Sequence, residues 1–176
     1  ASVSGPAARL VASGVVSNVS FSSYGRNTLT INTASGADDN VFSVQPSAGN
    51  YGTAINTSLY EEFTVTPALG YYLDLSSLTF LISRTANGAT NYAVRSSQDN
   101  FATNISTGNI STSSATKTIS LASSSISAVT FRIYFYGGSS TGFVRIDDVT
   151  LVGNVNCLQP TAYTVTGGGA VCSGTG

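Results

Sequence analysis

Arginine, tyrosine and acidic side chains carry most of the chemistry available to this chain. The sequence has 176 residues, with seven Lys plus Arg and eight Asp plus Glu, and six of the seven basic residues are Arg. A guanidinium group binds hydroxyl, carboxylate or sulfate groups with two parallel hydrogen bonds. Aromatic rings stack on the C–H faces of sugars. The bias toward Arg over Lys therefore favours anion recognition, and Arg together with Tyr suits a saccharide site.

The composition argues against several classes of function. The chain has no His, so it lacks Ser-His or Cys-His nucleophile pairs and imidazole metal ligands. A net charge of −1 leaves no basic surplus for phosphate backbones, and we expect no nucleic-acid partner. The longest apolar runs are a few residues long, which predicts no membrane span.

Two carboxylates at a suitable separation could hydrolyse a glycosidic bond. Glu61/Glu62 and Asp147/Asp148 are adjacent pairs within predicted strands, where neighbouring side chains point to opposite faces. Neither pair is expected to face a common substrate, and we predict that the chain is not an enzyme. Composition alone leaves a Tyr/Arg lyase centre open.

Two acidic clusters have the oxygen ligands that a hard cation prefers. Asp38 begins a predicted Asp-Asp-Asn turn, and Asp147 begins an Asp-Asp pair in the last predicted strand. Calcium binds such carboxylates together with backbone carbonyls, although no EF-hand spacing is present. One structural calcium ion at Asp147 or Asp38 is one interpretation, and solvated acids are the other.

The hydrophobic pattern predicts an all-β protein. Apolar residues alternate with polar ones in short runs, separated by turn residues every 8–15 positions. Nine strands in one domain fit a two-sheet antiparallel β-sandwich of jelly-roll type. The predicted strands are 15–21, 29–33, 41–45, 59–66, 78–84, 92–97, 117–121, 129–136 and 142–152.

Alternation assigns faces to the functional side chains. In strand 129–136, Phe131, Ile133 and Phe135 point to the core, which places Arg132, Tyr134 and Tyr136 on the outer face. The same argument places Glu62, Arg95 and Arg145 outward. If these strands are neighbours, they form a strip of guanidinium, carboxylate and phenol groups on a rigid sheet. The alternative is a cross-strand ion ladder of Glu62 with Arg95 or Arg132 that only solubilises the sheet.

Two loops add candidates for ligand contact. Arg84 and Arg95 flank the loop 85–91, whose Gly, Asn and Thr content suits a binding loop on a rigid scaffold. Tyr51, in the turn 48–52, is predicted to be the best exposed aromatic residue; packing over a sheet edge is its alternative role. The full set of candidate ligand-binding residues is Arg84, Asn91, Arg95, Arg132, Tyr134, Tyr136, Tyr51 and Glu62.

Composition also suggests the compartment and the domain limits. Charged residues make up 9% of the chain, against about a quarter in ordinary globular domains, and Ser, Thr, Asn and Gly replace them. This favours a secreted bacterial protein. We place an N-terminal linker at 1–11, the β-sandwich at 12–153, and a linker with the start of another domain at 154–176. Cys157 and Cys172 either form a disulfide across this short tail or belong to separate domains.

Several segments resemble a known group of domains. They include YEEFTVTP at 60–67, YAVRSS at 92–97, VTFRIY at 129–134 and FVRIDDVTL at 143–151. This series is similar to the secreted β-sandwich domains of surface proteins and polysaccharide-degrading enzymes of marine Bacteroidetes, many of which look like jelly-roll carbohydrate-binding modules. The resemblance covers residues 12–153, and the tail from Cys157 resembles the start of an Ig-like repeat.

The resemblance implies a function and one metal ligand. It implies a monomeric, non-catalytic module that binds an extracellular polysaccharide and tethers a covalently attached enzyme or cell surface to it. The Arg bias favours an acidic or sulfated algal glycan. An acid near Asp147 often helps hold calcium in such modules, which favours Asp147 as a ligand. The alternative function is a structural or adhesive domain of a bacterial surface protein without a glycan site.

Overall fold

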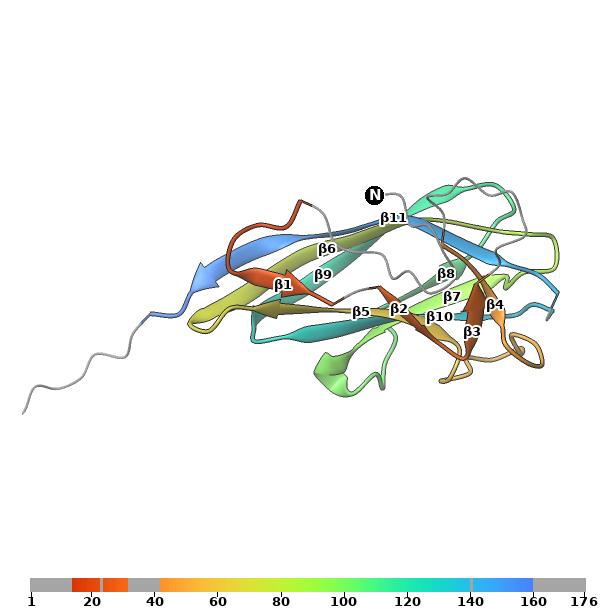
Figure 1. Ribbon diagram of the computed structural model, residues 1–176, viewed down its shortest axis with the longest axis horizontal. Coiled ribbons are helices and arrows are strands. Elements are labelled where there is room, and N and C mark those ends of the chain that lie inside the picture. Colours follow the sequence, from red (N-terminus) through yellow and green to blue (C-terminus); the bar gives the residue numbers. More distant parts are fainter. Residues whose placement is uncertain (1–13, 23, 32–41, 140, 160–176) are drawn as a thin grey trace, which may run out of the picture.

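Two antiparallel sheets pack face to face in the computed structural model, which describes residues 14–22, 24–31, 42–139 and 141–159 (Figure 1). The first sheet has the order β1-β5-β10-β7-β8, with β2 also paired to β5, and the second has the order β3-β4-β11-β6-β9. The predicted all-β sandwich is confirmed. The strands are β1 Val19–Phe21, β2 Gly25–Asn27, β3 Leu29–Ile31, β4 Phe42–Pro46, β5 Tyr60–Pro67, β6 Tyr71–Arg84, β7 Asn91–Ser96, β8 Ser106–Asn109, β9 Ala115–Ile126, β10 Val129–Tyr136 and β11 Val144–Cys157.

The core lies between the sheets and follows the predicted alternation. Phe131, Ile133 and Phe135 of β10 are all buried, and they face Phe80 and its neighbours on β6 in the second sheet. Each of these side chains removes apolar surface from water, at about 25 cal/mol per Å². The alternate residues of β10 are left for the outer face.

Strand limits differ from the prediction where β-bulges interrupt the alternation. β6 begins at Tyr71 and not at residue 78, because register shifts against β9 lie between Leu73 and Ser77. β11 likewise shifts register against β6 between Asp147 and Thr150 and again after Val152. An extra residue at a bulge moves the following side chains to the other face, so the period of two is lost there.

β11 also passes the limit placed at residue 153. Its last residue, Cys157, pairs with Tyr71 of β6, so the segment 154–157 belongs to the second sheet. Cys172 lies outside the described residues, and its pairing with Cys157 stays a prediction. So does the domain expected to follow.

Two short strands and one helical turn were not predicted. β2 and β8 have three and four residues and little apolar content. The 3-10 turn η1, Ser97–Asp99, follows β7 and lies under the first sheet in Figure 1. Among the residues that the structure describes, no helix has the length and apolar character to cross a membrane.

Candidate functional site

The strands that carry the predicted outer strip are neighbours. β10 lies between β5 and β7, and Arg132 pairs in register with Glu62 on one side and with Arg95 on the other. The outward side chains here form what we call the arginine face. Its members are Tyr60, Glu62, Asn91, Arg95, Arg132, Tyr134 and Tyr136, with Phe101 from the loop after β7.

Arg132 is the centre of the arginine face. Its Nε donates to Glu62 Oε2 at 3.0 Å, and the two side chains keep 25% and 38% of their surface exposed. The guanidinium carbon lies 4.2 Å from the ring centroid of Tyr60 and 3.8 Å from that of Phe101. Partial burial acts to lower the pKa of Arg132, but hydrogen bonds to Glu62 and Tyr134 outweigh it and raise the pKa. The cation is therefore held in one orientation by two rings and a carboxylate.

Arg95 is fixed by the loop that follows its own strand. Its Nε donates to Asn104 Oδ1 at 2.7 Å and its Nη1 to the carbonyl of Phe101 at 3.0 Å. Its guanidinium also lies over the ring of Tyr134, 5.4 Å from the centroid. The fold therefore places two guanidinium groups and one carboxylate in a single row across three strands.

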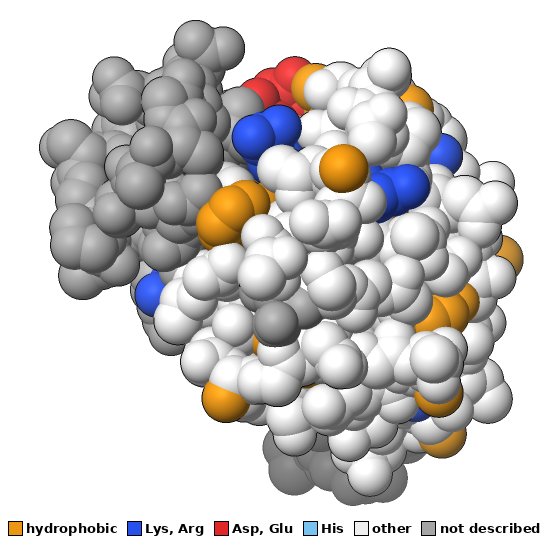
Figure 2. Space-filling model, turned by 90° about the vertical axis from the view of Figure 1, so that its right-hand side faces the viewer, with side chains coloured by type: hydrophobic (Ala, Val, Ile, Leu, Met, Phe, Trp, Pro, Cys, Tyr) orange, Lys and Arg blue, Asp and Glu red, His pale blue; other side chains and the backbone are white. Residues whose placement is uncertain are grey.

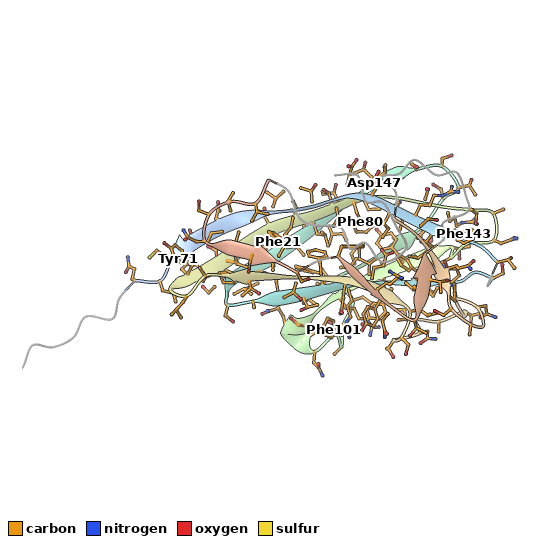
Figure 3. All side chains as sticks on the ribbon, in the orientation of Figure 1. Phe21, Tyr71, Phe80, Phe101, Phe143 and Asp147 are labelled. Carbon is orange, nitrogen blue, oxygen red and sulfur yellow. The ribbon has the colours of Figure 1, made fainter. Side chains whose placement is uncertain are left out.

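The loop 97–105 supplies two residues that sequence reasoning missed, Phe101 and Asn104. Asn100 and Phe101 have positive φ angles of 57° and 59°, and Asp99 accepts from the backbone N–H groups of Ala102 and Thr103. The hydrogen bond from the Thr103 hydroxyl, together with these backbone hydrogen bonds, lowers the pKa of Asp99. The loop thereby turns back under the sheet, and Figure 3 shows Phe101 on the opposite side of the first sheet from Phe80 in the core. The available signal was a lone aromatic residue after an Asp-Asn turn.

Tyr134 lies on the predicted face, but its ring is covered. It is 1% exposed and packs edge-on against Tyr60, with ring centroids 5.5 Å apart. Ala93 completes this small cluster, against which Ile55 and Tyr136 pack. Burial raises the pKa of Tyr60. The expectation of an open tyrosine pair is therefore wrong for Tyr134, and Tyr136 and Phe101 are the partly exposed rings.

The prediction that Tyr51 is an exposed aromatic is wrong. Its side chain is fully buried, and its hydroxyl donates to the carbonyls of Val44 at 2.9 Å and Gly142 at 3.3 Å. Burial raises the pKa of this phenol. The Gly- and Asn-rich turn around Tyr51 predicted an exposed side chain. Burial of the ring at the end of the sandwich is more favourable, because it removes a large apolar surface from water.

Arg84 and Arg145 belong to the second sheet and not to the arginine face. Arg84, at the end of β6, donates to the carbonyls of Ile110 at 2.8 Å, Thr85 at 3.1 Å and Ala86 at 2.6 Å. Its guanidinium group thus links the loop that follows β6 to the segment that follows β8. Arg145 lies on β11 opposite Ser83 and Ser43. The expectation of one face holding all outward Arg residues is therefore wrong, because the sequence does not say which sheet a strand joins.

Asn91 lies beside Tyr136 at the end of the arginine face. The two residues pair in register, and the Asn91 amide donates to Thr90 Oγ1 at 2.8 Å. The loops at this end present few charges: Figure 2 shows a surface of mostly uncharged polar atoms, with Lys, Arg, Asp and Glu in small separate spots. Against this background the row of Glu62, Arg132 and Arg95 is a distinct concentration of charge.

The acids proposed for calcium do not form a complete site in the described residues. Asp147 accepts from the N–H of its neighbour Asp148 at 2.8 Å, and Figure 3 places it on the side of the sandwich opposite Phe101. No group of three acidic, Cys or His residues gathers within the ranges that the structure describes. Asp38 lies outside them. The calcium site stays a prediction.

Glu61 is a buried acid on the inner side of β5. It is fully buried, it accepts a hydrogen bond from the Tyr24 hydroxyl at 2.7 Å, and its other oxygen has no hydrogen-bond partner. Burial raises the pKa of Glu61 to about 8, against an ordinary value of 4.5. At neutral pH this carboxyl group is therefore mostly protonated.

Comparisons with known proteins show a likeness in fold. No family model and no curated protein matches the sequence. A solved family 4 carbohydrate-binding module is 13% identical over 74% of this chain and 78% of its own, with a TM-score of 0.50. A family 29 carbohydrate-binding module variant complexed with cellulohexaose is 14% identical over 84% of this chain and 86% of its own, with a TM-score of 0.46. The first likeness confirms the β-sandwich fold of such modules.

Proposed function

We propose that this chain is a non-catalytic carbohydrate-binding module of a secreted or surface protein, and that its arginine face binds an extracellular polysaccharide bearing carboxylate or sulfate groups. The observation that carries the proposal is the register of Arg132 with both Glu62 and Arg95. Two guanidinium groups against one carboxylate leave a net positive charge on this strip. That charge would attract an anionic substituent of a glycan.

The neighbouring groups suit the rest of a sugar ring. Phe101, which lies against Arg132, and Tyr136, at the end of β10, are partly exposed rings, and an aromatic face stacks on the C–H side of a pyranose. Glu62 and Asn91 offer hydrogen bonds to hydroxyl groups. Because the side chains are held by ion pairs, rings and the loop 97–105, the site would be largely preformed and shallow.

The role of such binding is to raise effective concentration. The module would hold an attached enzyme or cell surface near an insoluble or gel-like polysaccharide. Each later contact between the attached partner and the polysaccharide would then be intramolecular. Acidic and sulfated algal polysaccharides are the substrate class that the two Arg residues favour. The solved carbohydrate-binding module of similar fold supports a binding role. Glu61 and Glu62 lie on opposite sides of β5, so this pair does not face a common substrate.

A structural or adhesive domain is the second candidate, favoured by the burial of Tyr134 and by the Arg132–Glu62 ion pair. In that case the arginine face is only a cross-strand ladder that solubilises the sheet. The two functions differ in whether Arg132 matters for anything besides stability.

Affinity electrophoresis distinguishes the binding function from the structural one. The chain should be retarded in gels containing carrageenan, fucan or alginate more than in neutral glucans, and chemical desulfation of carrageenan should remove most of the retardation. Replacing Arg132 by Ala should weaken binding by about tenfold or more, the cost of about 1.5–3 kcal/mol for a charge-assisted hydrogen bond.

Arg145→Ala is the matched control, because it removes an Arg from the outer face of the second sheet and should leave retardation unchanged. Thermal melting of both variants checks that they fold. No retardation in any anionic or neutral polysaccharide would exclude the binding function and favour the structural one. An equal loss of retardation in the Arg132 and Arg145 variants would show that the glycan does not bind specifically at the arginine face.

A further inference from the structure

Arg95 and Arg132 lie directly opposite each other on the arginine face. They pair in register on β7 and β10, so that their Cβ atoms are about 4.5–5.5 Å apart. Among the strands that the structure describes, no other two Arg residues are paired in this way. Like charges at opposed positions destabilise a sheet. Such a pair therefore indicates a role other than stabilising the fold.

One charge of this pair is not balanced by a neighbouring acid. Glu62 and Arg132 form the only ion pair within the described part of the chain, at 3.0 Å. Asp99, the acid nearest to Arg95 in the sequence, accepts hydrogen bonds from N–H groups of its own loop. In the same part of the chain, Arg95 donates only to neutral oxygens. The two Arg residues therefore keep a net positive charge that an anionic ligand group can balance.

Phe101 holds both guanidinium groups in place. Its ring centroid lies 3.8 Å from the guanidinium carbon of Arg132, and its backbone carbonyl accepts a hydrogen bond from Arg95 Nη1 at 3.0 Å. Its φ angle of 59° is uncommon for a residue with a bulky side chain, so the loop 97–105 holds Phe101 in a conformation that this residue rarely adopts. Phe101 is therefore a positioning residue that fixes the spacing of the two cations.

Donors of both Arg residues remain for a ligand. A guanidinium group has five N–H donors. Arg132 uses its Nε toward Glu62 and takes part in one further hydrogen bond with Tyr134. Arg95 uses its Nε and Nη1, whereas its Nη2 makes no hydrogen bond within the described residues. Both side chains are partly exposed, so one ligand group on this face can accept hydrogen bonds from both of them.

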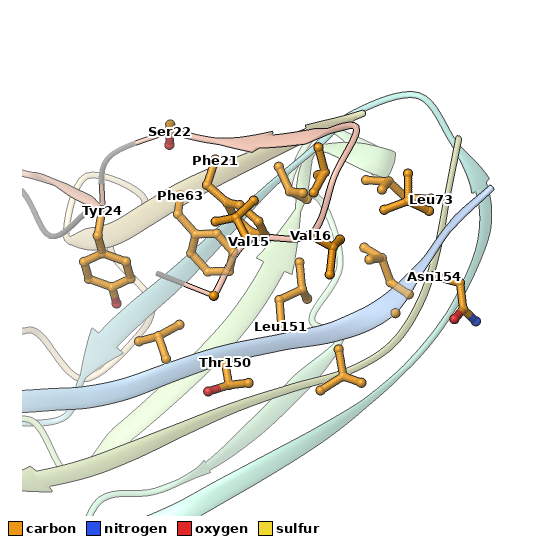
Figure 4. A pocket seen from close by; sticks show the side chains of 18 of the residues that line it. Val15, Val16, Phe21, Ser22, Tyr24, Phe63, Leu73, Thr150, Leu151 and Asn154 are labelled. Atoms are coloured by element: carbon orange, nitrogen blue, oxygen red, sulfur yellow. The ribbon is translucent and has the colours of Figure 1, made fainter. Parts of the chain in front are cut away.

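A groove between the two sheets is a poor alternative for an anionic group. It has a volume of about 720 Å³ and lies between β1 and β11. Figure 4 shows apolar side chains along it, among them Phe21, Phe63 and Leu73. Its described lining contains two acids, Asp147 and Asp148, and no Lys or Arg. An anion would lose its water there without gaining a cation, so anion recognition falls to the arginine face.

We infer that Arg95 and Arg132 together bind one sulfate ester of the glycan, so that the arginine face prefers sulfated polysaccharides to those with uronic acids; this inference rests on the proposed binding function. The terminal oxygens of a sulfate ester point in different directions, and two guanidinium groups from neighbouring strands can each donate to them. A carboxylate has two oxygens in one plane, which match the fork of a single Arg. With a carboxylate, the second Arg stays unpaired and the repulsion between the two cations persists.

Affinity electrophoresis of the unmodified chain tests this inference without any variant. One gel contains carrageenan, and the other contains carrageenan that has been desulfated and then carboxymethylated to the same charge per sugar. The apparent affinity should be about tenfold or more higher in the sulfated gel, because the carboxylated polymer lacks the hydrogen bonds with one Arg. Equal retardation in the two gels would overturn this inference and leave the proposed function standing. No retardation in carrageenan would overturn it as well, whereas the proposed function fails only if no polysaccharide retards the chain.

A pair of variants shows whether the two Arg residues bind the same group. Arg95→Ala and Arg132→Ala should each weaken binding to carrageenan by about tenfold or more. The double variant should lose less than the product of the two losses, since residues that share a ligand group are not independent. Losses that multiply would assign the two residues to separate groups and overturn the inference. Thermal melting checks that each variant is folded.

The positioning role of Phe101 has its own test. Phe101→Ala should reduce the ratio of the affinity for sulfated carrageenan to that for the carboxymethylated polymer, a readout that a merely structural residue would not change. Leu69→Ala is the matched control, because it removes a fully exposed apolar side chain from the turn after β5, and it should keep the ratio. An unchanged ratio in the Phe101 variant would overturn this role.

Discussion

Glu61 and Glu62 are adjacent in the chain and have opposite environments. Glu62 faces solvent on the arginine face and is paired with Arg132. Glu61 points into the core, where the Tyr24 hydroxyl is its hydrogen-bond donor. The alternation of a β-strand is the cause, because it sends one side chain of each adjacent pair inward whatever its polarity. The buried acid is then mostly neutral at physiological pH, which avoids the cost of an unpaired buried charge.

This difference predicts that the free energy of unfolding depends on pH, and that a substitution at Glu61 removes this dependence. The pKa of Glu61 is about 8 in the folded protein against 4.5 ordinarily, so the unfolded chain loses this proton first as the pH rises. The contribution of Glu61 to the free energy of unfolding is therefore complete below pH 4.5 and declines between pH 4.5 and 8. Urea unfolding across this range should show that decline, and Glu61→Gln should flatten it.

Glu62→Gln is the control for the pH experiment. It changes the neighbouring carboxylate on the solvent side of the same strand and should keep the decline. A Glu61→Gln variant whose stability falls as steeply as that of the unmodified chain would show that another group titrates.

Two loops at one end of the sandwich pack backbone against backbone. The N–H of Thr85 donates to the carbonyl of Phe143 at 3.0 Å, and the N–H of Ser139 donates to the carbonyl of Asn87 at 3.0 Å. Gly142 lies so close to Asn87 and Gly88 that a Cβ atom there would overlap their backbones. This close approach lies where β6 and β10 end and where β7 and β11 begin, next to the paired residues Asn91 and Tyr136.

Gly142→Ala should therefore destabilise the protein. One methyl group at this contact forces the two loops apart, which costs about 1–3 kcal/mol in a well-packed site. Chemical denaturation measures the loss of unfolding free energy. Thr53→Ala, in an exposed loop, should change it by about 0.5 kcal/mol or less. If the two variants are equally stable, the loops do not pack as closely as described.

The outer faces of the two sheets present different kinds of side chain. The arginine face covers the first sheet, whereas the middle of the second sheet presents hydroxyl groups, with Thr118, Thr79 and Thr150 in register across three strands. Asp147 lies on this second side (Figure 3). A glycan on the arginine face and an ion near Asp147 would therefore be too far apart to share ligands, and their effects should be separable.

The predicted calcium ion can be tested through the stability of the whole domain. A site at Asp147 should make a chelator lower the melting temperature and added calcium restore it, since a ligand that binds only the folded state stabilises it. Asp147→Asn should remove this response. Asp99→Asn, on the other side of the molecule, should retain it. A melting curve unchanged by the chelator would exclude the site.

Much of the fold was predictable because period-two alternation is a local property. Phe131, Ile133 and Phe135 were assigned to the core from β10 alone, and the structure buries all three. The same pattern placed Glu62, Arg95 and Arg132 outward. It failed at the bulges of β6 and β11, where one extra residue reverses the faces, and at β8, which has no apolar residue to show a pattern.

The sequence by itself determined that this chain is an all-β sandwich, poor in charge, with Arg, Glu and Tyr on outward strand positions. Only the tertiary structure decided that β5, β10 and β7 are neighbours, that Arg145 lies on the other sheet, that Tyr51 is buried and that Phe101 returns over Arg132. The physical reason is that the direction of a side chain follows from its own strand. Strand order and loop paths depend instead on which distant segments bury the most apolar surface together.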